Sequence, residues 1–365
     1  MTARRIFLAA TGQNRGKTTT SLGLAAAIAG RGHRLAFLKP IGQRYVLVDG
    51  GRADEDAVLM KAVFDLPDPL DDMSPVTLPR HFTTDFVMGR VADDQAGAVL
   101  AAAERLARER DLVLVEGTGH AGVGAVIGLS NARVAALLEA PVVIVSEGGV
   151  GRPIDEIVLN QALFERHGVR VLGAVVNKVN VDASPELREV LRRGLARQGI
   201  ELLGCIPYSD FLANPSLELI ESHLPGKRLS GEPAAERTIG HVAIGAMQAE
   251  HAVPLLRDRT LLITPGDRDD LLSAALDLNE GAPPGGVPRV SGVVLTGGLR
   301  PPHAVVERMR AADLWSYLVE SDTYRTAEAV HGVLVKTHPG DTEKIATIIR
   351  LVGESLDADA LLARV

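Results

Sequence analysis

The chain has 365 residues, which is too long for one average domain and suggests two. Hydrophobic residues make up 46% of it, enough for sizeable cores, so an intrinsically disordered chain is excluded. The 39 Lys and Arg residues against 46 Asp and Glu give a formal charge of −7, which argues against a nucleic-acid-binding protein with a basic face.

Cysteine content and hydropathy bear on the compartment. The single cysteine, Cys205, excludes an internal disulfide and a cysteine-based metal site. The apolar run near the N-terminus is broken by polar residues 13–15 and is too short for a signal peptide. No apolar stretch approaches the length of a membrane span. We therefore expect a cytoplasmic protein that contacts no membrane.

The first two-thirds of the chain alternates apolar strand-like runs with helical patterns. The expected strands are Ile6–Ala10, Leu35–Leu38, Leu112–Val115, Val142–Val145, Val171–Val176 and Leu202–Ile206. The expected helices are Thr19–Ala29, Gln95–Arg110, Ala132–Glu139, Ile154–Arg166 and Pro185–Arg197. Strands that are nearly continuous in Val, Ile and Leu indicate a sheet covered on both faces. This predicts an α/β fold with a doubly wound, mostly parallel sheet.

A second, smaller α/β region follows. Breakers between residues 214 and 237 flank a short helix, Leu217–His223, and we place a domain boundary near Ala213. Beyond it we expect strands Thr260–Thr264, Gly292–Leu295, Tyr317–Val319 and Val333–Lys336, with helices from Asp269, His303, Thr323 and Thr342. The expected domains are thus 1–213 and 214–355, followed by a C-terminal tail, 356–365.

The segment between the first strand and first helix reads Thr11-Gly-Gln-Asn-Arg-Gly-Lys-Thr18. A strand, a tight loop ending Gly-Lys-Thr and a helix form the arrangement that holds a nucleoside triphosphate. Loop N–H groups and the helix N-terminus would point at phosphate oxygens, Lys17 would neutralise the phosphates and Thr18 would hold Mg²⁺. The expected nucleotide contacts are Gly12, Asn14, Gly16, Lys17, Thr18 and Thr19. The alternative is an ordinary glycine-containing turn.

Other polar residues follow later strands, where ligands of parallel sheets bind. Glu116, in Glu116-Gly-Thr-Gly-His120, is placed to hold Mg²⁺, or alternatively caps a turn. Lys39 would reach a phosphate or a carboxylate substrate, unless it is a solvated lysine. Asp56 either adds a metal ligand or favours a helix N-terminus through its charge. Asn177 could pair with a purine edge, or it is a turn asparagine.

Together, residues from about Ile6 to Tyr208 resemble the dethiobiotin synthetase-like group of P-loop enzymes. The resemblance rests on the order and spacing of Gly16-Lys-Thr, Lys39-Pro, Asp56-Ala, Val115-Glu-Gly-Thr-Gly, Val176-Asn-Lys and Leu203-Gly with Ile206-Pro-Tyr. It implies that Lys17 and Thr18 bind phosphate and Mg²⁺, that Asp56 and Glu116 complete the metal site, and that Asn177 reads adenine. It also implies that Lys39 stabilises substrate or phosphoryl charge, so the catalytic candidates are Lys17, Lys39 and Glu116.

Two segments depart from the synthetase pattern: residues 13–15 in the loop, and His120-Ala-Gly-Val-Gly124 on the substrate side. Diaminopelargonate is therefore not the expected substrate. His120 itself is expected to be a surface or loop histidine.

Residues from roughly Pro215 to Arg325 resemble the DRTGG domain. The resemblance rests on Thr264-Pro-Gly-Asp-Arg-Asp269 and, after the next strand, Leu295-Thr-Gly-Gly298. Asp267 and Arg268 would pair to brace two turns or would bind an anion. The two-domain order resembles the N-terminal region of long phosphate acetyltransferases, which implies a phosphotransacetylase-family protein without the acetyltransferase domain.

These resemblances predict a Mg²⁺- and ATP-binding regulatory protein, weakly hydrolytic, whose second domain senses a small anionic ligand or forms a homodimer or higher homo-oligomer. The enzymatic alternative is an ATP-dependent ligase that activates a carboxylate or carbamate as a mixed phosphate anhydride. A third is a structural partner of a separate acetyltransferase. The sequence leaves open whether ATP is hydrolysed or only bound, and whether GTP replaces it.

Overall fold

The computed structural model describes residues 3–79, 81–91, 95–180, 186–234, 237–281 and 286–365. The chain forms two compact units, residues 1–208 with 342–365, and residues 209–341. Among the described residues, no helix combines the length and the apolarity that crossing a membrane requires.

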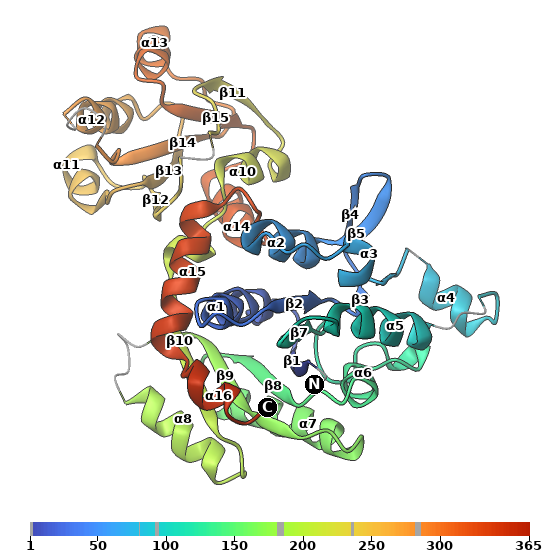
Figure 1. The fold of residues 1–365 in the computed structure, drawn as a ribbon. Helices are drawn as coiled ribbons and strands as arrows, with labels where there is room; N and C mark the ends of the chain where they lie inside the picture. The colour runs from blue at the N-terminus through green and yellow to red at the C-terminus, as the bar shows by residue number, and fades with distance from the viewer. Residues whose placement is uncertain (1–2, 80, 92–94, 181–185, 235–236, 282–285) are drawn as a thin grey trace. The chain divides into compact units, whose positions relative to one another are not determined.

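The first unit is built on a parallel sheet (Figure 1). Its described strands lie in the order β10 (Leu202–Pro207), β9 (Val171–Val179), β8 (Val142–Glu147), β1 (Arg4–Ala10), β7 (Leu112–Glu116) and β2 (Leu35–Leu38). Most of their side chains are buried, as expected for strands covered on both faces. The predicted doubly wound α/β fold is confirmed.

Helices cover both faces of this sheet, with α1 and α15 on one face and α7 and α8 on the other (Figure 1). The helices of this unit are α1 (Lys17–Ala29), α2 (Glu55–Phe64), α3 (Leu70–Met73), α4 (Phe82–Val87), α5 (Gln95–Ala107), α6 (Asn131–Leu137), α7 (Gly151–Arg166), α8 (Leu187–Ala196), α15 (Thr342–Ser355) and α16 (Ala358–Leu362). Pro185, the expected start of α8, lies outside the described residues.

The connection from β2 to β7 carries short strands that the sequence did not predict. They are β3 (Ile41–Gly42), β4 (Tyr45–Val48), β5 (Gly51–Asp54) and β6 (Val76–Thr77). β4 and β5 form an antiparallel hairpin that leads into α2. The Asp54 side chain caps α2 by accepting a hydrogen bond from the Asp56 N–H at 3.0 Å. This hairpin therefore fixes where Asp54 and Asp56 lie.

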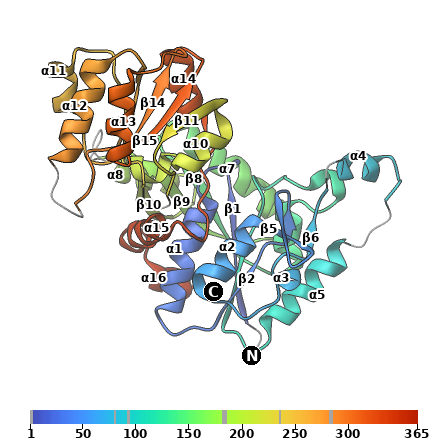
Figure 2. The ribbon, with the colours of Figure 1, turned by 90° about the horizontal axis from the view of Figure 1, so that it is seen from above.

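The second unit contains a mixed sheet that lies between its helices (Figure 2). Its described strands lie in the order β11 (Gly226–Ser230), β15 (Trp315–Val319), β14 (Val290–Thr296), β13 (Thr260–Pro265) and β12 (His241–Ile244), with β11 antiparallel. Its helices are α9 (Asp210–Ala213), α10 (Leu217–His223), α11 (Ala249–Ala252), α12 (Asp269–Glu280), α13 (His303–Ala311) and α14 (Thr323–Gly332). Helices α12 and α13 lie on one side of the sheet, and α10 and α14 lie on the other.

The strand predicted at Val333–Lys336 is wrong, because these residues form no strand. The position beside β15 is already taken by β11, an edge strand that the sequence reading did not find.

The end of the chain differs from the expected division. Residues 342–355 were assigned to the second domain and 356–365 to a tail, but both segments pack in the first unit. The apolar face of α15 contacts α1 and β10. The approach is close because Gly23 stands opposite Val352: a Cβ on Gly23 would lie 2.1 Å from the Val352 Cβ. Burial of this apolar face stabilises the packing of α15 on the first unit, although α15 directly follows the second unit in the sequence.

Candidate functional site

The loop from Thr11 to Gly16 connects β1 to α1 at the carboxyl edge of the first sheet. Gly16 has φ +96°, a conformation that favours glycine. It is the N-cap residue of α1, which begins at Lys17. A Cβ there would lie 1.8 Å from the Asn177 Nδ2, so glycine is also required by the close approach. Thr19 lies half-buried in the first turn of α1.

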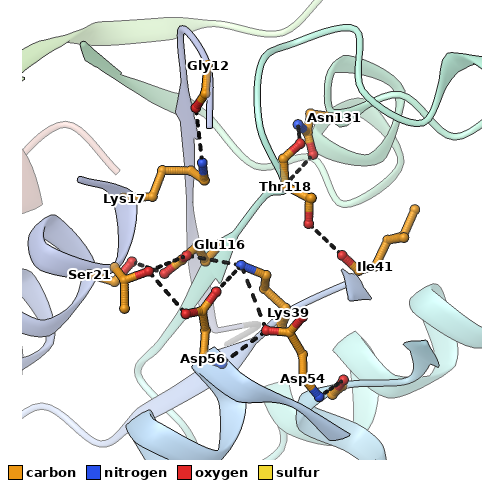
Figure 3. Close-up of polar contacts among 12 residues, drawn as sticks. Gly12, Lys17, Ser21, Lys39, Ile41, Asp54, Asp56, Glu116, Thr118 and Asn131 are labelled. Carbon is orange, nitrogen blue, oxygen red and sulfur yellow. Dashed lines mark hydrogen bonds and ion pairs between the residues drawn. The ribbon is translucent and has the colours of Figure 1, made fainter. Parts of the chain in front are cut away.

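Lys17 is buried at the first position of α1, and its Nζ lies 3.5 Å from the Gly12 carbonyl oxygen (Figure 3). Burial lowers the pKa of Lys17 to about 8, because removing an ammonium from water disfavours its charge. The Glu116 carboxylate opposes that shift and Lys39 adds to it. A phosphate group beside Lys17 would provide the compensation that a buried ammonium otherwise lacks.

Lys39 follows β2 directly and is only 4% exposed. Its Nζ forms ion pairs with the carboxylates of Asp56 and Glu116, at 3.0 Å for Glu116, and lies 4.0 Å from Asp54 Oδ1 (Figure 3). Burial alone would lower the pKa of Lys39, but Asp56 and Glu116 outweigh it and raise that pKa. Lys39 is therefore not a solvated surface lysine.

Glu116 ends β7 and is 1% exposed. Burial raises the pKa of Glu116, although Lys39 opposes that rise. Ser21 donates a hydrogen bond to Glu116 Oε2 at 2.6 Å, and the Thr18 hydroxyl oxygen lies 3.2 Å from Oε1. The same Thr18 oxygen lies 3.1 Å from Asp56 Oδ1. Three segments far apart in sequence thus bring their side-chain oxygens to one place.

The loop after Glu116 is held by Asn131 of α6. Its Oδ1 accepts from the Thr118 N–H at 3.1 Å, and its Nδ2 donates to the carbonyls of Thr118 and His120, both at 2.7 Å. The Thr118 hydroxyl donates to the Ile41 carbonyl at 2.6 Å. His120 is exposed, and its Nδ1 accepts from the Gly122 N–H, so it is a loop histidine, as expected.

Sequence reasoning missed several residues of this site. Ser21 lies three residues after Thr18, so helical spacing places both on one face of α1 and could have pointed to it. Asp54 is buried beside Lys39, and burial raises its pKa to about 7. Asn131 had no local signal, because its role depends on a loop 11–13 residues earlier.

In the second unit, Arg268 makes its ion pair with Asp270, at 2.8 Å. It also donates to the carbonyls of Gly245 at 3.1 Å and Met247 at 2.7 Å. Arg268 therefore braces the turns after β12 and β13. Thr296 and Thr323 share a hydroxyl–hydroxyl bond of 2.7 Å, and Gly297 and Gly298 both have positive φ.

Curated relatives match nearly the whole chain. A phosphate acetyltransferase of Nitrosomonas europaea is 27% identical over 98% of this chain and 51% of its own length. One from Pseudomonas putida is 30% identical over 96% of this chain and 50% of its own. The chain thus spans about half the length of these relatives. A solved cobyrinic acid a,c-diamide synthase of Mycobacterium smegmatis, with ADP and magnesium, is 17% identical over 57% of this chain and 87% of that one, with a TM-score of 0.38.

Two family models match in series, an AAA domain over residues 4–216 and a DRTGG domain over residues 219–333. The predicted order of a P-loop domain and a DRTGG domain is thereby confirmed. With more than half of its length in the first match, the chain belongs to the AAA domain family and carries a DRTGG domain after it.

Proposed function

We propose that the first unit binds a nucleoside triphosphate, ATP by preference, together with Mg²⁺. The observation that carries this proposal is the convergence of two buried ammonium groups, Lys17 and Lys39, with Thr18, Asp56 and Glu116 beside a glycine-containing loop. Lys17 would contact the β- and γ-phosphates, and Lys39 would exchange a carboxylate partner for a γ-phosphate oxygen. The loop and the start of α1 supply the N–H groups that phosphates favour.

The donor set suits a magnesium ion. Thr18, Asp56 and Glu116 offer hard oxygen ligands, the type that Mg²⁺ prefers. The described residues contain no group of three or more His, Cys, Asp or Glu side chains suited to hold a metal by themselves. Mg²⁺ usually keeps waters and takes phosphate oxygens in addition to one or two carboxylates, so a nucleotide-dependent ion fits better than a resident one. When bound, it would neutralise phosphate charge.

The role we propose is regulatory. The curated relatives are named for acetyl transfer, and this chain spans about half of each. Nucleotide binding is the function that its own residues support. The DRTGG unit would sense a small anionic ligand or mediate self-association, and a separate acetyltransferase is a candidate partner. A cytoplasmic location would supply both nucleotide and Mg²⁺.

Calorimetry tests the proposal directly. Mg²⁺–ATP and Mg²⁺–GTP are titrated into the wild type and into Lys17→Ala, which loses charge-assisted phosphate contacts of about 1.5–3 kcal/mol, or roughly ten- to hundredfold in affinity. Lys61→Ala is the matched control, because Lys61 donates to the carbonyls of Leu66 and Asp68 and lies outside the site. Absence of binding to the wild type, or equal affinity in Lys17→Ala, contradicts the proposal.

The metal is tested by Glu116→Gln, which keeps the shape and removes the charge. We expect this variant to lose more affinity with Mg²⁺ present than with EDTA. Equal losses in the two conditions would assign Glu116 a structural role. Release of phosphate from ATP, measured on the same proteins, separates hydrolysis from binding alone.

A further inference from the structure

Two consecutive residues of β9 donate hydrogen bonds to the phosphate loop, which is the Thr11–Gly16 segment between β1 and α1. Asn177 Nδ2 donates to the Arg15 carbonyl at 3.3 Å, and Lys178 Nζ donates to the Asn14 carbonyl at 3.2 Å. Lys178 also pairs with Glu147 Oε1 at 2.7 Å, and the Arg15 guanidinium pairs with the same carboxylate. Two adjacent carbonyls of the loop are thus tied to the ends of β8 and β9.

The start of the loop is tied down as well. The Thr11 N–H donates to the Val145 carbonyl at 2.9 Å, and the Thr11 hydroxyl donates to Glu156 Oε2 of α7 at 3.0 Å. The other oxygen of Glu156 lies 3.8 Å from an Arg15 nitrogen. Thr11 and Arg15 are therefore both connected to the same two elements, β8 and α7.

These bonds fix the orientation of the loop peptides. The C=O and N–H of a trans peptide point in opposite directions. With the Asn14 and Arg15 carbonyls directed at Lys178 and Asn177, the N–H groups of Arg15 and Gly16 are directed away from those side chains. This is the arrangement in which loop N–H groups can gather around an anion. Asn177 is 4% exposed, and its side chain also occupies the space that a Cβ on Gly16 would need.

We propose that Asn177 and Lys178 are positioning residues that hold the phosphate loop in its binding conformation. They then support binding of the phosphate chain itself, including a ligand that has no base. This differs from the role that resemblance implies for Asn177, in which its amide reads adenine. This proposal rests on the proposed phosphate site at Lys17 and extends it to the residues that hold the loop in its binding conformation.

Inorganic triphosphate, which carries no base, separates the two roles. Binding of Mg²⁺–ATP and Mg²⁺–triphosphate is measured on the wild type, Asn177→Ala and Lys178→Met. Loss of one bracing hydrogen bond should weaken both ligands by the same factor, about 3- to 10-fold in each variant. Arg193→Met, a charge loss at a 74%-exposed side chain of α8, is the matched control and should leave both affinities unchanged. A loss confined to ATP would overturn the proposal and assign Asn177 to the base.

A second readout needs no ligand. Hydrogen exchange of the Thr20 amide, which donates to the Gly16 carbonyl at 2.9 Å, should quicken severalfold in both variants in ligand-free protein and stay unchanged in the control. Lys178 is 40% exposed, so Lys178→Met should remain folded even if Asn177→Ala does not. Unchanged exchange in Lys178→Met refutes the proposal. A wild type that binds neither ligand would instead refute the phosphate site, while the exchange rates would still report whether the loop is braced.

Discussion

Replacing Lys39 by Met tests whether the buried charges of the site depend on one ammonium. Lys39 Nζ pairs with Asp56 and Glu116 and lies 4.0 Å from Asp54 Oδ1. Met fills nearly the same volume but removes the charge. The change leaves three acidic side chains close together, two of them at most 3% exposed. Removing one partner of a buried ion pair costs about 3–5 kcal/mol, because the remaining charge is uncompensated.

The cost should depend on pH, since the carboxyl groups can protonate instead. Burial already raises the pKa of Asp54 from 3.8 to about 7, and it raises the pKa of Glu116. Without Lys39 both pKa values rise further. A carboxyl group whose folded pKa exceeds its unfolded pKa binds more protons in the folded state, so stability falls as pH rises between the two values. The Lys39→Met cost should therefore be smaller near pH 5 than near pH 8.

Urea unfolding in EDTA at these two pH values measures the effect. The matched control is Lys61→Met, which removes hydrogen bonds to two carbonyls and should cost about 1–3 kcal/mol, nearly independently of pH. Adding Glu116→Gln to Lys39→Met should recover part of the loss at pH 8, because one uncompensated charge disappears. A cost that is absent, or equal at both pH values, would refute the account of Lys39 as the counter-ion of this cluster.

Three further outcomes are expected. Because burial lowers the pKa of Lys17 to about 8, the free protein must take up a proton to bind phosphate above that pH, so ATP affinity should fall about tenfold from pH 7 to pH 9; calorimetry showing constant affinity would contradict this. Gly23→Ala should lower stability by about 1–3 kcal/mol through its clash with Val352, and thermal unfolding of the double variant with Val352→Ala should show partial recovery. A fragment of residues 209–341 should fold alone, whereas a fragment of residues 209–365 should aggregate because α15 would expose its apolar face. Light scattering that finds the shorter fragment as aggregated as the longer one would contradict the assignment of α15 to the first unit.

The sequence alone determined the sheet and the position of the loop. Continuous Val, Ile and Leu runs of strand length are tolerated only where both faces are covered, so they predicted the parallel strands β1, β2, β7, β8, β9 and β10. Parallel strands direct their carboxyl ends to one edge, which is why polar residues after separate strands were expected to meet there. Lys17, Lys39 and Glu116 do meet there in the structure.

Only the tertiary structure decided which partners these residues have. Asp54 and Asn131 join the site through a hairpin and a helix whose positions no local pattern encodes. The resemblance implies that Asn177 reads adenine; the structure adds that its amide donates to the loop carbonyl of Arg15, 162 residues earlier. The helix α15 follows the second unit in sequence yet packs on the first, because its apolar face can approach α1 closely at Gly23. Hydrogen-bond direction and surface complementarity between distant segments depend on three-dimensional placement, which periodicity and spacing do not specify.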